Sequence, residues 1–186
     1  RSFQLRNILR DNTAFGLYET HKQRSDAEVL SHSAFQEVPL LKSLRDKAYK
    51  QLGSSGGGNH FVEFGIVDLL VDRADWQLRK GTYLAVLSHS GSRGLGANIA
   101  KHYTYLAQKQ CPLPKQVQQF AWLDLDTHDG QEYWLAMNLA GDYARACHED
   151  IHRRLAKALG ERPVLTIGNH HNFAWKEMYQ GKEVIV

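Results

Sequence analysis

Residues 53–67 read GSSGGGNHFVEFGIV, a glycine- and serine-rich run followed at once by apolar and aromatic residues. The polar run is too short, and its change to apolar residues too abrupt, for a linker between domains. The pattern predicts a tight loop that feeds directly into a β-strand starting near Phe61. Three consecutive glycines in such a loop let the backbone approach a ligand closely.

Helices and strands are predicted on both sides of this stretch. Residues 40–52 carry apolar side chains at helical spacing between Pro39 and Gly53, which predicts an amphipathic helix that stops at the glycine. Residues 83–87 form a second apolar run of strand length, followed by a polar loop and a predicted helix over residues 97–110.

A long helix is predicted in the second half of the chain. Apolar residues recur every fourth position before Gly160 and Pro163, a stripe that buries one side of a helix of roughly seven turns. The stripe consists of Leu135, Leu139, Tyr143, Cys147, Ile151, Leu155 and Leu159.

The C-terminal part of the sequence predicts a last short strand over residues 164–167, running into the polar sequence GNHHNF at residues 168–173. We find no internal repeat and no domain boundary, so we expect one α+β domain over residues 1–186 with three polar loops at strand ends. The chain begins at Arg1 and ends in a β-prone run, residues 183–186, with nothing after it to pair. We therefore expect these residues to be the central portion of a longer polypeptide.

Composition limits the classes of protein that this chain can belong to. Its 186 residues, 42% hydrophobic and 23% charged, fit a globular domain and exclude collagen, coiled coil and disorder. No run reaches the roughly 18 apolar residues that span a bilayer, and no signal peptide is evident, so we expect a cytoplasmic protein without a membrane partner. Cys111 and Cys147 are expected to be reduced thiols, and a net charge of +3 permits a polyanionic partner.

The three polar loops each supply a histidine: His60 after the triple glycine, His89 in a Ser/Gly/Arg loop, and His171 after the last predicted strand. Neutral imidazole suits Zn, Mn, Fe or Cu, glycine-rich backbone binds phosphate, and Arg93 can bind phosphate oxygens in a fork. The set favours a metal-assisted phosphoryl-transfer site. The alternative is that these are loop histidines that bind only backbone groups.

A rival motif lies in the predicted long helix, where His148-Glu149-x-x-His152 has the spacing of zinc metalloproteases. Both histidines follow the buried stripe by one position, and arginines surround them. This context predicts a solvated flank of a packed helix and makes a zinc hydrolase the weaker hypothesis.

Three ordered segments of the chain resemble signature segments of the RtcB family of RNA-splicing ligases. They are GGGNHFVE at residues 56–63, HSGSRG at residues 89–94 and HNFA at residues 171–174. The resemblance extends over residues 40–186 and implies an RtcB-like fold, in which strands carry metal-binding loops at their ends and helices, one of them long, flank the strands.

The resemblance also implies a reaction. The family joins RNA ends that carry a 2′,3′-cyclic phosphate or 3′-phosphate to 5′-hydroxyl ends, using GTP and two Mn²⁺ ions through a guanylated histidine. By motif match, His60 would bind one manganese ion, His89 and His171 would bind the other, and Arg93 would contact RNA phosphate. The residues that would line the guanylate pocket are Asn59, His60, Phe61, Val62, Glu63, His171 and Asn172.

Two parts of the family site have no match in this chain. The Asp-x-x-Cys-Gly segment that supplies two further metal ligands is absent, and the guanylated histidine would lie beyond Val186. These residues alone are therefore expected to hold three of the five metal ligands and no catalytic histidine. A degenerate RNA-binding or regulatory homologue without ligase activity is the alternative, and the need for a protein activator stays open.

Overall fold

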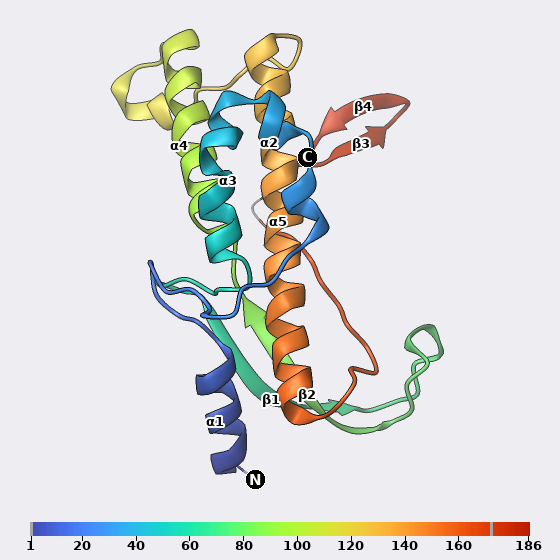
Figure 1. The fold of residues 1–186 in the computed structure, drawn as a ribbon. Coiled ribbons are helices and arrows are strands. Elements are labelled where there is room, and N and C mark those ends of the chain that lie inside the picture. The colour runs from blue at the N-terminus through green and yellow to red at the C-terminus, as the bar shows by residue number, and fades with distance from the viewer. Residues whose placement is uncertain (1, 172) are drawn as a thin grey trace.

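A computed structural model describes residues 2–171 and 173–186 of the chain, and it mixes helices and strands as the α+β prediction requires (Figure 1). In chain order the elements are α1 (Ser2–Asn12), η1 (Glu28–Ser31), α2 (Ala34–Glu37), α3 (Pro39–Gln51), β1 (Phe61–Leu69), η2 (Ala74–Trp76), β2 (Gly81–His89), α4 (Arg93–Gln110), η3 (Lys115–Phe120), α5 (His128–Leu159), β3 (Lys176–Tyr179) and β4 (Lys182–Ile185). The elements labelled η are short 3-10 helices.

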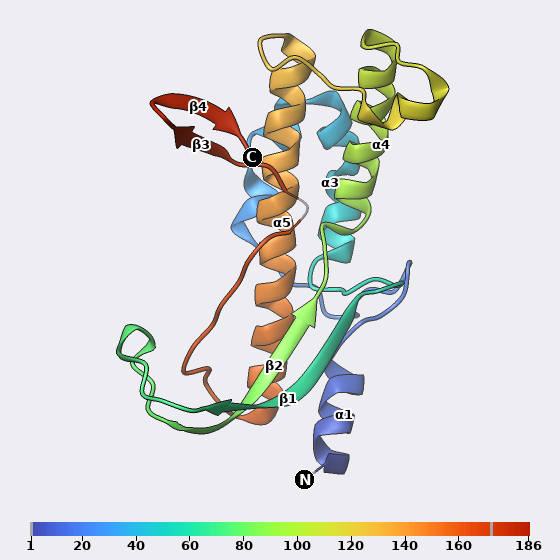
Figure 2. The ribbon, with the colours of Figure 1, turned by 180° about the vertical axis from the view of Figure 1, so that it is seen from behind.

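The core lies where α3, α4 and α5 run side by side, an arrangement visible from both directions (Figures 1 and 2). Five positions of the predicted stripe on α5 are buried. The largest buried apolar side chains, these five included, are Phe35, Leu41, Leu95, Tyr103, Leu139, Tyr143, Cys147, Ile151 and Leu155. The Tyr143 hydroxyl donates a 2.7 Å hydrogen bond to the Ala48 carbonyl and so joins α5 to α3. The part of the stripe from Leu139 to Cys147 packs against α3 and α4, whereas Ile151 and Leu155 are buried outside that cluster.

Helix α5 is capped at both ends. The Thr127 hydroxyl accepts a 3.2 Å hydrogen bond from the Gly130 N–H, which caps the first turn. The helix ends at Gly160, whose φ of +73° is the left-handed conformation that glycine adopts easily. The predicted stop at this glycine is therefore confirmed.

Strands β1 and β2 form one antiparallel ribbon, in which Phe61 lies opposite His89 and Leu69 opposite Gly81. The first predicted apolar run begins at the first residue of β1, as expected, and the second is the central part of β2. The ribbon crosses the lower part of α5 (Figure 2). Its register places the glycine-rich loop, which precedes β1, beside the end of β2.

Helix α4 begins at Arg93, four residues before the predicted start at Ala97. The Gly94 N–H donates a 2.9 Å hydrogen bond to the side-chain oxygen of Gln51, which satisfies a free N–H of the first turn from the end of α3. Gln51 is distant in sequence from this turn. The local sequence, which is rich in glycine, therefore did not indicate that the helix begins this early.

The strand predicted over residues 164–167 is wrong. These residues form no strand, with a bend at Val164, and Val164 and Ile167 are exposed. A strand needs a hydrogen-bonding neighbour, and within the described part of the chain β1 pairs with β2 and β3 with β4. The segment after α5 instead runs back along that helix towards its middle (Figure 2).

The β-prone C-terminal run does pair, with the strand that precedes it. Strand β4 is antiparallel to β3, with Lys176 opposite Ile185, through a turn at Gln180 and Gly181 that both have positive φ. Cys147 is buried, Cys111 is half-buried, and both are free thiols. Among the described residues, no helix has the length and apolar character needed to cross a membrane.

Candidate functional site

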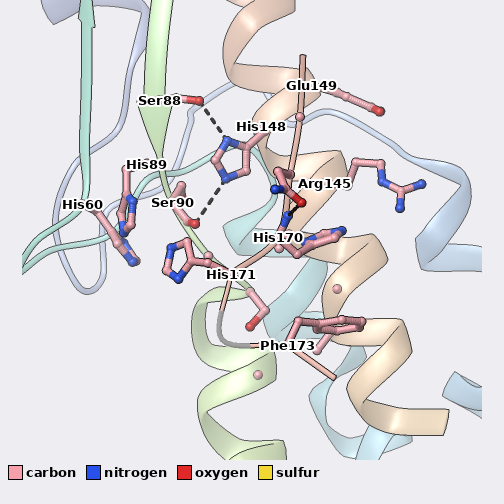
Figure 3. A pocket seen from close by; sticks show the side chains of 18 of the residues that line it. His60, Ser88, His89, Ser90, Arg145, His148, Glu149, His170, His171 and Phe173 are labelled. Atoms are coloured by element: carbon pink, nitrogen blue, oxygen red, sulfur yellow. Dashed lines mark hydrogen bonds between the residues drawn. The ribbon is translucent and has the colours of Figure 1, made fainter. Parts of the chain in front are cut away.

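The end of the β1–β2 ribbon, the middle of α5 and the segment after α5 enclose a pocket of about 1340 Å³ (Figure 3). Six of the ten histidines in the chain line this pocket: His60, His89, His148, His152, His170 and His171. They come from four segments that are far apart in the sequence. Such a cluster of imidazoles is a candidate for metal binding, because neutral imidazole is the commonest metal ligand in proteins.

His60 is held in one tautomer by the loop that precedes it. Its Nδ1 lies 2.5 Å from the Ser55 carbonyl oxygen, so Nδ1 carries the proton and donates it to that acceptor. Burial lowers the pKa of His60, which favours the neutral ring. The lone pair on Nε2 is then free for a ligand, the arrangement that metal-binding histidines usually have.

The structure brings His60, His89 and His171 together, as the motif match requires. The ring centres of His60 and His89 are 5.8 Å apart, and those of His89 and His171 are 4.9 Å apart with nearly parallel planes. The donor types suit a divalent ion. However, within the described residues no three His, Cys, Asp or Glu side chains converge on one point that could hold an ion. The metal assignments of these three histidines therefore stay predictions.

Only some of the residues expected to bind the guanylate line the pocket. Asn59, His60 and His171 line the pocket, while Phe61, Val62 and Glu63 lie on β1 outside its lining. The Phe61 ring stacks on His89 at 5.6 Å, so Phe61 contacts one of the pocket histidines from β1. Asn172 lies outside the described residues. A nucleotide pocket around these residues stays a prediction.

Arg93 is hydrogen-bonded to the glycine-rich loop and is not part of the pocket lining. Its Nε donates to the Ser54 hydroxyl at 3.1 Å, and its Nη2 donates to the Gly16 carbonyl at 3.0 Å. In this position the guanidinium connects the loop to the N-terminal segment. The predicted contact with RNA phosphate stays untested.

His148 and His152 are placed differently from the prediction of a solvated flank, which is wrong. Both side chains are half-buried and line the pocket, and each has a ring nitrogen 2.8 Å from the Ser88 hydroxyl oxygen. The periodicity of α5 could not reveal this, because it is β2 that covers this side of the helix. The zinc-hydrolase hypothesis finds no third ligand in the described residues, and Glu149 points away from His148 (Figure 3).

Comparison with known proteins matches residues 2–186 to the family described as "tRNA-splicing ligase RtcB". The chain belongs to the RtcB family. This confirms the resemblance drawn from the three motifs, which are the loops that meet at the pocket.

Several curated RtcB proteins are similar to this chain over much of its length. The tRNA-splicing ligase RtcB of Thermococcus kodakarensis is 27% identical over 98% of the chain and 42% of its own length. The RNA-splicing ligase RtcB of Mycobacterium tuberculosis is 31% identical over 91% of the chain and 42% of its own length. The RNA-splicing ligase RtcB homolog 1 of Entamoeba dispar is 31% identical over 64% of the chain and 23% of its length. The chain thus spans less than half the length of these relatives.

Proposed function

We propose that the protein is an RNA ligase that joins 2′,3′-cyclic phosphate or 3′-phosphate ends to 5′-hydroxyl ends with GTP and two Mn²⁺ ions. The observation that carries the proposal is the meeting of His60, His89 and His171 in one pocket. These residues come from the three motifs by which the chain resembles the family. A chance gathering of unrelated loop histidines does not account for that correspondence.

In the proposed site His60 would hold one metal ion, and His89 and His171 would hold the other. Bound Mn²⁺ would neutralise charge on phosphoryl oxygens as a nucleophile attacks. The chain itself supplies one nitrogen donor in a defined state, Nε2 of His60, since the Ser55 carbonyl fixes the tautomer of that ring. Asn59 and His171, which line the same pocket, would face the nucleotide.

The proposal takes two further metal ligands and the guanylated histidine from polypeptide outside residues 1–186. The test must therefore use the whole natural protein. It is incubated with RNA carrying 2′,3′-cyclic phosphate and 5′-hydroxyl ends, with and without GTP and Mn²⁺. We expect joined RNA only when both are present, and an increase in intact protein mass of one GMP.

The variant His60→Ala should lose joining, while His128→Ala, at a side chain that is 86% exposed, should retain it. RNA with 3′-hydroxyl and 5′-phosphate ends should not be joined. Protein that binds RNA but neither joins it nor gains GMP would contradict the proposal and support a degenerate RNA-binding homologue.

A further inference from the structure

Helix α5 is hydrogen-bonded to both neighbours of His89 through one side chain, that of His148. Its Nδ1 lies 2.8 Å from the Ser88 hydroxyl, and its Nε2 lies 3.2 Å from the Ser90 carbonyl oxygen. Figure 3 shows both contacts converging on the ring from the end of β2. Neither the motif match nor the comparisons assign a role to His148.

The acceptor at Ser90 decides where the protons lie. A carbonyl oxygen can only accept, so Nε2 of His148 carries a proton and donates it. Burial lowers the pKa of His148, so the ring is neutral and its Nδ1 has a lone pair. The Ser88 hydroxyl therefore donates to Nδ1 of His148, and Nε2 of His152 donates to the Ser88 oxygen. Every ring nitrogen in this chain of bonds has one defined role except Nδ1 of His152.

The chain of bonds continues to His60. The Ser90 hydroxyl donates a 3.0 Å hydrogen bond to the Ser55 carbonyl, which is also the acceptor of the His60 Nδ1–H. Ser90 thus links His148 on α5 to the loop that fixes His60. Ser88 links the same ring to the strand end that carries His89.

We infer that His148 is a positioning residue, which holds the loops carrying His60 and His89 in a fixed relation to each other. Binding of a ligand between two loops loses affinity when the loops must first be ordered, so a rigid anchor between them raises affinity. That the ligand is Mn²⁺ rests on the proposed function. The hydrogen bonds themselves do not depend on it.

Two substitutions of His148 separate its contact with Ser88 from its contact with Ser90. His148→Asn places an amide near the position of Nδ1 and keeps the Ser88 contact, but it cannot reach the Ser90 carbonyl. His148→Gln reaches the Ser90 carbonyl and loses the contact with Ser88. His128→Gln serves as the matched control, because that ring is exposed and outside the pocket.

Amide hydrogen exchange of the whole protein reports each loop directly. We expect faster exchange near Ser55 and His60 in His148→Asn, faster exchange near Ser88 and His89 in His148→Gln, and no change in either for the control. The α3–α4–α5 core should exchange as in the wild type. Imidazole ¹⁵N spectra should show the Nε2–H tautomer for His148 and the Nδ1–H tautomer for His60.

Titration with Mn²⁺, followed by the electron paramagnetic resonance of the free ion, gives the functional readout. Loss of a group that orients metal ligands costs about tenfold or more in affinity, and we expect that for both His148 variants. Unchanged loop exchange in both variants, or uniform acceleration that includes the core, would overturn the inference. A wild-type protein that binds no Mn²⁺ would contradict the proposed function, and the exchange pattern would still decide the role of His148.

Discussion

Gly56 occupies a crowded position in the glycine-rich loop, with φ at +97°. A Cβ there would lie 1.9 Å from Nη1 of Arg93 and 2.7 Å from Nδ1 of His60. Gly58 also has positive φ, at +75°, but no atom lies within 4 Å of the position that a Cβ would take there. Gly58→Ala should therefore cost only backbone strain, about 1–2 kcal/mol in the free energy of unfolding. Gly56→Ala should cost more, because it also displaces Arg93 and His60.

Urea unfolding of the two variants measures this difference. Equal losses of unfolding free energy would contradict the expectation that Arg93 and His60 crowd a side chain at position 56.

Asp150 lies on α5 behind the same loop and is buried. Burial raises the pKa of its carboxyl, but hydrogen bonds from Arg154, Ser25 and Arg153 outweigh burial and hold the pKa below its ordinary value. A carboxyl with a lowered folded-state pKa stabilises the protein above its unfolded pKa, about 4, and the contribution is lost as pH falls through the lower folded value. We expect Asp150→Asn to reduce stability at neutral pH and to flatten the acid side of the stability profile.

Urea unfolding of wild type and Asp150→Asn between neutral pH and about pH 3 tests this expectation. Parallel profiles would show that the Asp150 carboxylate does not contribute to acid sensitivity.

The helices and strands that could be predicted from the sequence are those that a local pattern determines. The stripe on α5 and the Pro39 and Gly53 boundaries of α3 indicated those helices, and apolar runs indicated the start of β1 and the centre of β2. Pairing was less predictable. Residues 164–167 have strand-forming composition without a partner, whereas β3 was missed because its partner is another short, exposed strand. Helix α1 had no distinctive pattern.

Helix α5 also positions the segment that carries His171. A Cβ at Gly141 would lie 2.8 Å from the ring of Phe173, so this glycine allows the segment to pack closely against the helix. Gly141→Ala should favour the helix itself by about 1 kcal/mol, because alanine is the better helix former. It should nevertheless displace Phe173 and weaken Mn²⁺ binding.

Calorimetric measurement of Mn²⁺ affinity, with thermal unfolding as the control for stability, tests this expectation. The double variant Gly141→Ala/Phe173→Leu should recover part of the lost affinity. Wild-type affinity in Gly141→Ala alone would contradict the packing argument.

In the molecule as a whole, the three motif loops meet because of contacts between segments that are far apart in the sequence. The register of β1 and β2 places Phe61 opposite His89, and the return of the chain along α5 brings His171 against His89. Sequence reasoning found these three histidines because each lies in a recognisable motif. It missed the contacts of His148, because they depend on β2 crossing α5 at one particular turn.

Anomalous scattering of Mn²⁺, in crystals of the whole protein grown with that ion, is the decisive experiment for the proposed metal centre. We expect anomalous peaks within coordination distance of the ring nitrogens of His60, His89 and His171, and none at His128. Peaks located elsewhere, or no peak in the pocket at saturating Mn²⁺, would contradict the proposed metal centre and the ligase function built on it.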